Sequence, residues 1–193
     1  NAYLPLIEEL VELKKTGCQI HYFEGNHDLD LKLYWQNKLG FDVKSEAAYY
    51  TIDGKTVRVE HGDQMDPEDR GYLFLRWLLR TSAVRFLGRA LPNSAVAKIG
   101  KRASLASRDY TTYVKSASDA QAIEKIRRHA LKAYAEKPFQ LIVSGHVHVP
   151  DDSRPSDKFR CVNTGTWLKE ALVFDLQDGA GRLVSVEELI RGN

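Results

Sequence analysis

Four of the six histidines lie in three short polar segments, each of which directly follows an apolar stretch. Neutral imidazole is a common ligand for zinc, manganese and iron, and amide or carboxylate oxygens suit manganese or magnesium. Each segment also contains a glycine, which lets the backbone approach a ligand closely. Taken singly, such segments are more often turns or structural histidines, but together they indicate a metal site. The segments are Gly25-Asn26-His27-Asp28, His61-Gly62-Asp63 and Gly145-His146-Val147-His148.

The elements that must position these segments follow an α/β pattern, in which ligands gather at the carboxyl ends of strands. The spacing of Leu6, Leu10 and Leu13 predicts an amphipathic helix that ends at Gly17. The Asp53-Gly54 pair predicts a tight hairpin turn. The hairpin strands are 48–52 and 55–60, a second helix is expected at 29–39, and further strands at 18–23, 139–144, 159–163, 170–174 and 183–187. Residues 151–158 have the composition of a linker.

From residue 67 to residue 136 long helical patterns replace the strand signals, which indicates a helical insertion between core segments 1–66 and 137–193. Residues 70–132 carry 14 Lys and Arg against three acidic residues, a local charge of +11 in a chain whose net charge is +2. This imbalance suits an anionic partner, although a charge run is more often a solvated helix face.

The bulk composition is that of an ordinary globular domain: 193 residues, 43% hydrophobic and 28% charged. Cys18 and Cys161 are the only cysteines, and both stand in apolar stretches. Two buried thiols are therefore expected rather than a disulfide, which favours a reducing compartment. No apolar run is long enough for a transmembrane helix, and no signal peptide is visible.

In their order, the three segments resemble the signature of the calcineurin-like metallophosphoesterases. The resemblance implies a sandwich of two mixed sheets flanked by helices, with a helical cap insertion and two divalent metal ions. Manganese is the expected metal, with magnesium, iron(II) and zinc as alternatives. The resemblance implies that Asn26, His61 and His146 ligate one ion and His148 the other. It also implies catalytic roles for Asn26 and for His27, the latter near the leaving group as a proton donor or charge stabiliser.

Two earlier motifs of that family, Asp-x-His and Gly-Asp at the ends of its first strands, are not found before Gly25. They would supply the remaining ligands of the second metal. The expectation is that these N-terminal strands lie upstream of Asn1.

Within the family, the sequence is most similar to the UDP-2,3-diacylglucosamine hydrolases of lipid A biosynthesis. The features are the basic insertion directly after His61-Gly62-Asp63, its size and place, and Gly145-His146-Val147-His148-Val149-Pro150 followed by Asn163-Thr164-Gly165-Thr166-Trp167. Those enzymes cleave a pyrophosphate bond in a lipid-linked nucleotide sugar, giving a lipid phosphate (lipid X) and UMP. One departure is His27, where many of these hydrolases have Arg.

That resemblance extends to the substrate and the location. The candidate substrate contacts are Asp69, Tyr72, Arg76, Lys101, Arg102, Arg108 and Lys115. A basic amphipathic insertion also suits an anionic membrane surface. A cytoplasmic enzyme, peripheral on the inner membrane of a Gram-negative bacterium, is therefore expected.

Three other interpretations stay open at this point. The first is a phosphoesterase of the same family that acts on a soluble phosphomonoester, phosphodiester or nucleotide. The second is a scaffold that has lost its metals, which the four retained ligand candidates disfavour. The third is a nucleic-acid binder, which is disfavoured because the aromatic residues of the basic segment are few and are expected to be buried. The sequence does not predict an oligomeric state.

Overall fold

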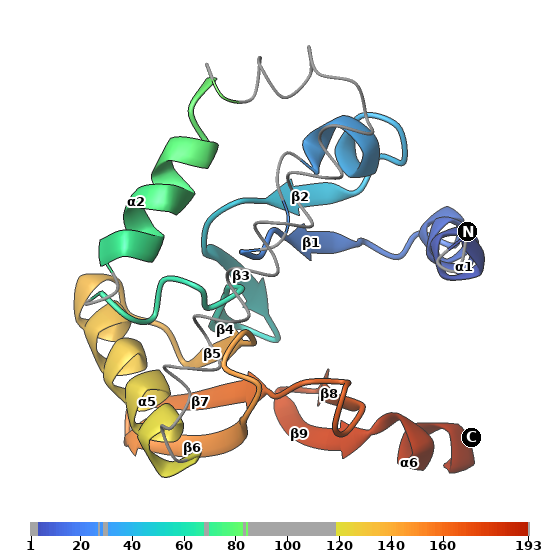
Figure 1. Ribbon diagram of the computed structural model, residues 1–193. Coiled ribbons are helices and arrows are strands. Elements are labelled where there is room, and N and C mark those ends of the chain that lie inside the picture. Colours follow the sequence, from blue (N-terminus) through green and yellow to red (C-terminus); the bar gives the residue numbers. More distant parts are fainter. Residues whose placement is uncertain are drawn as a thin grey trace.

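The computed structural model describes residues 4–26, 28, 31–67, 70–82, 84 and 119–192. Their centre is a five-stranded mixed sheet in the order β3-β4-β5-β7-β6 (Figure 1). β4 runs parallel to β5 and β5 parallel to β7, whereas the outer pairs are antiparallel. The strands are β3 (Ala48–Ile52), β4 (Lys55–Val59), β5 (Leu141–Ser144), β6 (Pro150–Ser156) and β7 (Phe159–Thr164).

The described residues also form two two-stranded ribbons. In the first, β1 (His21–Phe23) pairs in parallel with β2 (Asp42–Lys44). In the second, β8 (Leu172–Gln177) pairs antiparallel with β9 (Ala180–Ser185). The predicted α/β class is confirmed.

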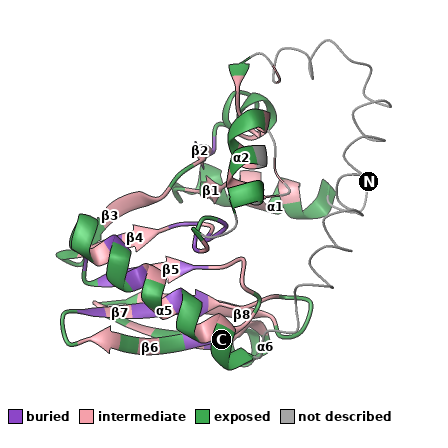
Figure 2. Ribbon diagram, turned by 60° about the vertical axis from the view of Figure 1, so that its left-hand side comes forward, coloured by how far each residue is buried: buried purple, intermediate pink, exposed green. Residues whose placement is uncertain are grey.

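The core is layered because successive side chains of a strand point to opposite faces of the sheet. On one face, Ile142 and Cys161 pack with Ile126 and Ala130 of α5 (Asp119–Glu136). On the other face, Leu141 and its neighbours Val57 and Val162 pack against β8 and β9 through Phe174, Leu176 and Leu183. Figure 2 shows α5 lying across the sheet, with buried residues on β4, β5 and β7. Fully burying one such aliphatic or aromatic side chain contributes roughly 1.5–3 kcal/mol.

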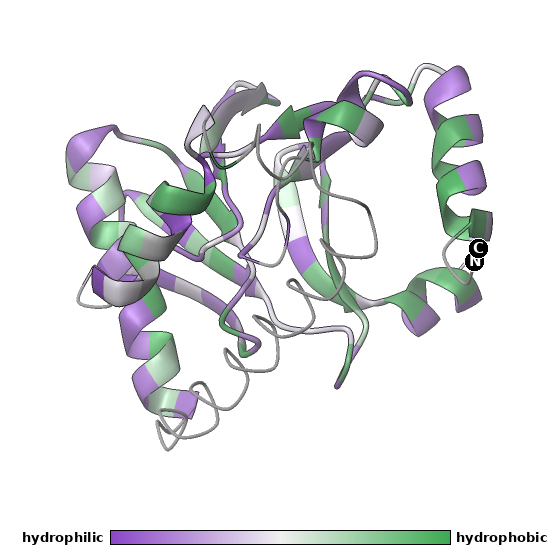
Figure 3. Ribbon diagram, turned by 45° about the horizontal axis from the view of Figure 1, so that its top comes forward, coloured by the Kyte–Doolittle hydropathy of each residue, from purple (hydrophilic) through white to green (hydrophobic). Residues whose placement is uncertain are grey.

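The remaining helices are α1 (Leu4–Lys15), the π-helix η1 (Lys32–Gln36), α2 (Arg70–Leu79) and α6 (Val186–Arg191). Hydrophobic and hydrophilic residues alternate along α1 and α5 (Figure 3), as expected of amphipathic helices. α1 is followed by Gly17 at φ 98°, which confirms the predicted helix end.

Several local predictions are wrong or shifted. The strands predicted at 18–23 and 170–174 cover His21–Phe23 and Leu172–Gln177. Residues 150–156 form the edge strand β6, not a linker. The predicted helix 29–39 is a five-residue π-helix over Lys32–Gln36 within the described residues. The strand predicted at 183–187 ends at Ser185, where the Ser185 hydroxyl accepts from the Glu188 N–H and starts α6. Cys18 is exposed, and only Cys161 is buried as predicted.

Candidate functional site

His61 and His146 lie side by side because they follow neighbouring parallel strands. β4 pairs with β5 through Val59 and Val143, and the Gly145 N–H donates to the His61 carbonyl over 3.1 Å. The two imidazole rings are steeply inclined to each other, at 66°, with centroids 5.1 Å apart. The structure thus brings two of the predicted metal ligands together at the carboxyl end of the sheet.

The segment Gly25-Asn26 reaches the same place from the end of β1. A Cβ atom at residue 25 would lie 2.7 Å from both Cε1 and Nε2 of His61, which is closer than real Cβ contacts allow. Glycine at this position therefore permits the close approach of the backbone to the His61 ring. Asn26, whose side-chain amide is a predicted ligand, is the next residue and is partly buried.

The loop that carries His146 and His148 is held in an unusual conformation. Both histidines adopt left-handed backbone angles, with φ of 68° and 63°. The loop is supported by the fully buried Asn163, whose Nδ2 donates to the Gly145 carbonyl (2.7 Å) and to Ser144 Oγ (3.1 Å). Asn163 Oδ1 in turn accepts from the Gly165 N–H over 3.1 Å.

The chemistry of these donors fits a divalent cation. Two adjacent imidazoles, together with the amide of Asn26 in the neighbouring segment, would form a mixed nitrogen and oxygen set, which suits manganese, iron(II) or zinc. The described residues contain no group of three or more His, Cys, Asp and Glu side chains that could hold an ion. Asn26 is not one of those four types, and His27 lies outside the described residues.

A cavity of about 360 Å³ opens beside the His61-Gly62-Asp63 loop. Its wall includes Lys44 at the end of β2, residues 45–47 after it, and the end of β4. It also includes Arg76 of α2 and the charged residues Lys125, Arg128 and Lys132 of α5. Positive and negative groups are mixed in this wall.

Glu60, directly before His61, is buried and joins β4 to α5. His129 Nε2 donates to Glu60 Oε1 over 2.5 Å, and Arg58 Nε donates to Glu60 Oε2 over 2.7 Å. Burial alone would raise the pKa of Glu60, but His129 and Arg58 outweigh it and hold this pKa below its usual value. Nothing in the sequence pattern singles out Glu60 or His129.

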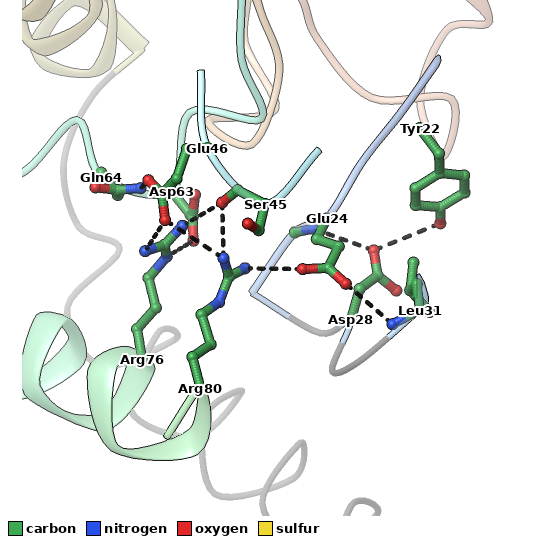
Figure 4. A network of polar contacts seen from close by, with 11 residues as sticks. Tyr22, Glu24, Asp28, Leu31, Ser45, Glu46, Asp63, Gln64, Arg76 and Arg80 are labelled. Atoms are coloured by element: carbon green, nitrogen blue, oxygen red, sulfur yellow. Dashed lines mark hydrogen bonds and ion pairs between the residues drawn. The ribbon is translucent and has the colours of Figure 1, made fainter. Parts of the chain in front are cut away.

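The predicted substrate contacts are only partly within the described residues. Arg76 lies in α2, and its nitrogens contact Asp63, Glu46 and the Ser45 carbonyl (Figure 4). Tyr72 also lies in α2, but its side chain is outside the described part. His148 is exposed. The candidates that lie outside the described residues are His27, Asp69, Lys101, Arg102, Arg108 and Lys115.

A mixed sheet flanked by helices, with histidines at the ends of neighbouring parallel strands, is the arrangement expected of a metallophosphoesterase-like α/β protein. The chain is similar in sequence to proteins named UDP-2,3-diacylglucosamine hydrolase from several bacteria. The relative from Stutzerimonas stutzeri is 28% identical over 72% of this chain and 56% of its own length. The one from Pseudomonas putida is 24% identical over 94% of this chain and 75% of its own length. The one from Porphyromonas gingivalis is 28% identical over 88% of this chain and 69% of its own length.

These similarities confirm the resemblance that the three motifs indicate. The chain spans between about half and three quarters of the length of these relatives, 56% in the first case and 75% in the second. No protein-family model matches the chain.

Proposed function

We propose that the protein is a metal-dependent hydrolase that cleaves the pyrophosphate bond of UDP-2,3-diacylglucosamine in lipid A biosynthesis. Water adds across one P–O bond of the diphosphate, and the products are lipid X and UMP. The main support for the proposal is that His61, His146 and the Gly25-Asn26 segment lie together. They do so in a chain similar to proteins named UDP-2,3-diacylglucosamine hydrolase.

The proposed ligands are Asn26, His61 and His146 for one cation and His148 for a second, with manganese as the expected metal. When bound, such cations would polarise the phosphoryl oxygens and activate a water molecule. The neighbouring imidazoles of His61 and His146 supply the nitrogen donors. His27 is proposed to protonate the departing oxygen or stabilise its charge, a role that typically contributes about 10²–10⁴-fold to the rate.

Residues 67–136 are proposed to form a cap over the core formed by 1–66 and 137–193. In α2, the side chains of Phe74 and Trp77 are both 62% exposed, and Leu78 is 38% exposed. Exposed apolar groups next to a strongly basic segment suit a ligand with acyl chains and phosphates. Asp69, Tyr72, Lys101, Arg108 and Lys115 remain the proposed substrate contacts. Arg76, the other candidate, donates from all three nitrogens to Asp63, Glu46 and Ser45. Peripheral association with the anionic cytoplasmic face of the inner membrane belongs to the same proposal.

The test is hydrolysis of UDP-2,3-diacylglucosamine by the full-length protein in detergent micelles with Mn²⁺, followed as UMP release. His61→Ala and His146→Ala are expected to lower the rate by more than about 100-fold, because the loss of an outer partner of a metal ligand already costs about 10–100-fold. His21→Gln is the matched control. His21 is an exposed residue of β1, and its ring Nδ1 is hydrogen-bonded to Asp42 Oδ2 of β2 (2.7 Å).

Two results would contradict the proposal. One is metal-dependent hydrolysis that survives His61→Ala. The other is a preference for p-nitrophenyl phosphate over the lipid diphosphate, which would favour a phosphoesterase for soluble substrates.

A further inference from the structure

Arg76 lies in the last turn of α2, and Arg80 directly follows its last residue, Leu79. The Arg80 N–H donates to the Arg76 carbonyl, so the two side chains, four residues apart, share one face of the helix. Arg76 Nε donates to Asp63 Oδ2 (2.9 Å), Nη1 to Glu46 Oε1 (3.1 Å) and Nη2 to the Ser45 carbonyl (2.8 Å). Arg80 Nη1 donates to the same carbonyl over 2.7 Å. Both guanidinium groups thus converge on the loop between β2 and β3 (Figure 4).

The two arginines also bind the loops that carry the predicted metal ligands. Asp63 stands two residues after His61, and Glu24 stands two residues before Asn26. Arg80 Nη2 lies 3.8 Å from Glu24 Oε2, so this contact is an ion pair. α2 is therefore tied to one loop through Asp63 and to the other through Glu24.

These contacts are shielded from water. The side chains of Asp63 and Glu24 are 4% and 6% exposed, and those of Arg76 and Arg80 are 12% and 18% exposed. Burial lowers the pKa of Arg76, but the carboxylates of Asp63 and Glu46 outweigh it, so the pKa is raised above its usual value. Removing either arginine would take away a cation that a buried carboxylate contacts, which is unfavourable.

Glu24 and Asp28 in turn accept hydrogen bonds from backbone N–H groups on either side of Asn26. Glu24 Oε1 accepts from the Leu31 N–H (3.0 Å), and Asp28 Oδ2 accepts from the Gly25 N–H (3.2 Å). Displacement of the Glu24 carboxylate would therefore move both ends of the segment around Asn26. It would also move Gly25, which lies against the His61 ring.

We infer that Arg76 and Arg80 are positioning residues, which hold the Asn26 and His61 loops in the arrangement that a metal ion requires. Arg76 acts through Asp63, and Arg80 acts through Glu24 and the Ser45 carbonyl. The inference rests on the proposed function for the identity of the metal ligands. It replaces the substrate contact expected of Arg76 with a positioning role, because all three nitrogens of Arg76 donate to residues of the core.

The experiment compares Arg76→Gln and Arg80→Gln with Arg70→Gln in the full-length protein. Arg70 is an exposed residue at the start of the same helix and serves as the matched control. The Kd for Mn²⁺ is measured by titration calorimetry, and backbone hydrogen exchange is measured by mass spectrometry. Both test variants are expected to raise this Kd by about 10- to 100-fold. They are also expected to speed exchange at residues 24–31 and 61–65, whereas Arg70→Gln changes neither quantity.

Steady-state kinetics separates positioning from substrate contact. A positioning role lowers kcat at saturating substrate and weakens Mn²⁺ binding, and added Mn²⁺ restores part of the rate. A rise in KM with an unchanged Kd for Mn²⁺ would overturn the inference, because it is the result expected of a substrate contact. Unchanged exchange in both loops would overturn it too. If Arg76→Gln does not fold, Arg80→Gln, which removes one hydrogen bond and two longer ion pairs, decides the question alone.

Failure of the proposed function gives a different result. If the Mn²⁺ affinity depends on Arg76 and Arg80 but the protein does not cleave UDP-2,3-diacylglucosamine, the inference is supported and the proposed substrate is wrong. A wild-type protein that binds no Mn²⁺ overturns the inference.

Discussion

His146 and His148 carry backbone strain. Both have φ values in the left-handed region, at 68° and 63°. This region disfavours residues with a Cβ by roughly 1–2 kcal/mol. Such strain persists only where the surroundings hold it, and the buried amide of Asn163 fixes the loop at Gly145. Since strained residues cluster at active sites and ligand clamps, the loop geometry independently favours a functional role for these two imidazoles.

Gly25 offers a direct test of the site at the scale of one atom. Gly25→Ala places a Cβ 2.7 Å from the His61 ring, which must move away. We expect the Kd for Mn²⁺ to rise by about tenfold or more, the lower end of the loss seen when a ligand is badly oriented. Gly145→Ala is the control, because its nearest contact would be an ordinary 3.6 Å to the His61 carbonyl oxygen. Equal Mn²⁺ affinity in the two variants would show that residue 25 does not adjoin the metal.

The two cysteines should differ sharply in reactivity. Cys161 is buried, and burial together with Asp151 and Glu60 raises the pKa of its thiol to about 12. The thiolate is the reactive form, so at about pH 8 Cys161 is protonated as well as inaccessible. Titration of the native protein with a chromogenic disulfide is expected to modify one thiol quickly, and Cys18→Ser is expected to abolish that phase. Fast modification of the Cys18→Ser variant before unfolding would contradict this expectation.

At the scale of the elements, α5 is fixed to β4 by the contact between His129 and Glu60. His129→Ala removes the 2.5 Å hydrogen bond and leaves the buried carboxylate with Arg58 alone. We expect the free energy of unfolding to fall by about 2 kcal/mol, the usual contribution of a hydrogen bond to a charged group. Urea denaturation measures this change.

Two further variants make that measurement specific. His129→Gln can still donate to Glu60 and is expected to lose less stability than His129→Ala. Arg128→Ala alters the exposed neighbour on the same helix, whose side chain is 73% exposed, and is expected to change stability by less than about 0.5 kcal/mol. A loss for Arg128→Ala as large as that for His129→Ala would assign the effect to the helix and not to the buried contact.

The elements that are predictable from the sequence are those whose signals are local. The Asp53-Gly54 turn fixes the β3–β4 hairpin, with Asp53 and Gly54 both at positive φ. Strands β5 and β7 are predictable because their apolar residues face both packed layers. The edge strand β6 escapes prediction because its residues are mostly polar, although it pairs with β7 and also has a partner distant in sequence. Arg127 of α5 donates to both carboxylate oxygens of Asp151 in β6.

The same distinction holds for the candidate site. The ligand segments are predictable because residue types suited to metals recur after apolar strands. The contacts of Arg80 with Glu24 and of His129 with Glu60 join residues 56 and 69 positions apart, so no local pattern could pair them. The four-residue spacing of Arg76 and Arg80 is a usable signal, since it places both side chains on one helix face.

For the whole molecule, the distribution of charge and of exposed apolar residues differs from one part to another. Residues 70–132 carry a charge of +11 in a chain whose total is +2. In the same segment Phe74 and Trp77 are 62% exposed, against the expectation that its aromatic residues are buried, and their rings lie 5.7 Å apart. No helix in the described part of the chain is long and apolar enough to cross a bilayer.

This combination predicts binding to the surface of an anionic membrane. Burying one aromatic side chain contributes roughly 1.5–3 kcal/mol, and each basic residue near an anionic surface adds about 1 kcal/mol. We therefore expect Phe74→Ala and Trp77→Ala each to weaken binding to phosphatidylglycerol vesicles by about tenfold or more in a sedimentation assay. Raising the salt from about 0.1 M to about 0.5 M should weaken vesicle binding by the wild type, because salt screens the charge of the basic segment.

Leu13→Ala is the control for that assay, since Leu13 is 48% exposed but lies on α1, outside the basic segment. It should bind vesicles as the wild type does. If all three variants bind equally and salt has no effect, α2 does not face the membrane, and Phe74 and Trp77 must then contact the acyl chains of the substrate or another part of the protein. The KM for the lipid diphosphate distinguishes these two cases. It rises in the Trp77→Ala variant if these residues contact the acyl chains, and it does not change if they contact another part of the protein.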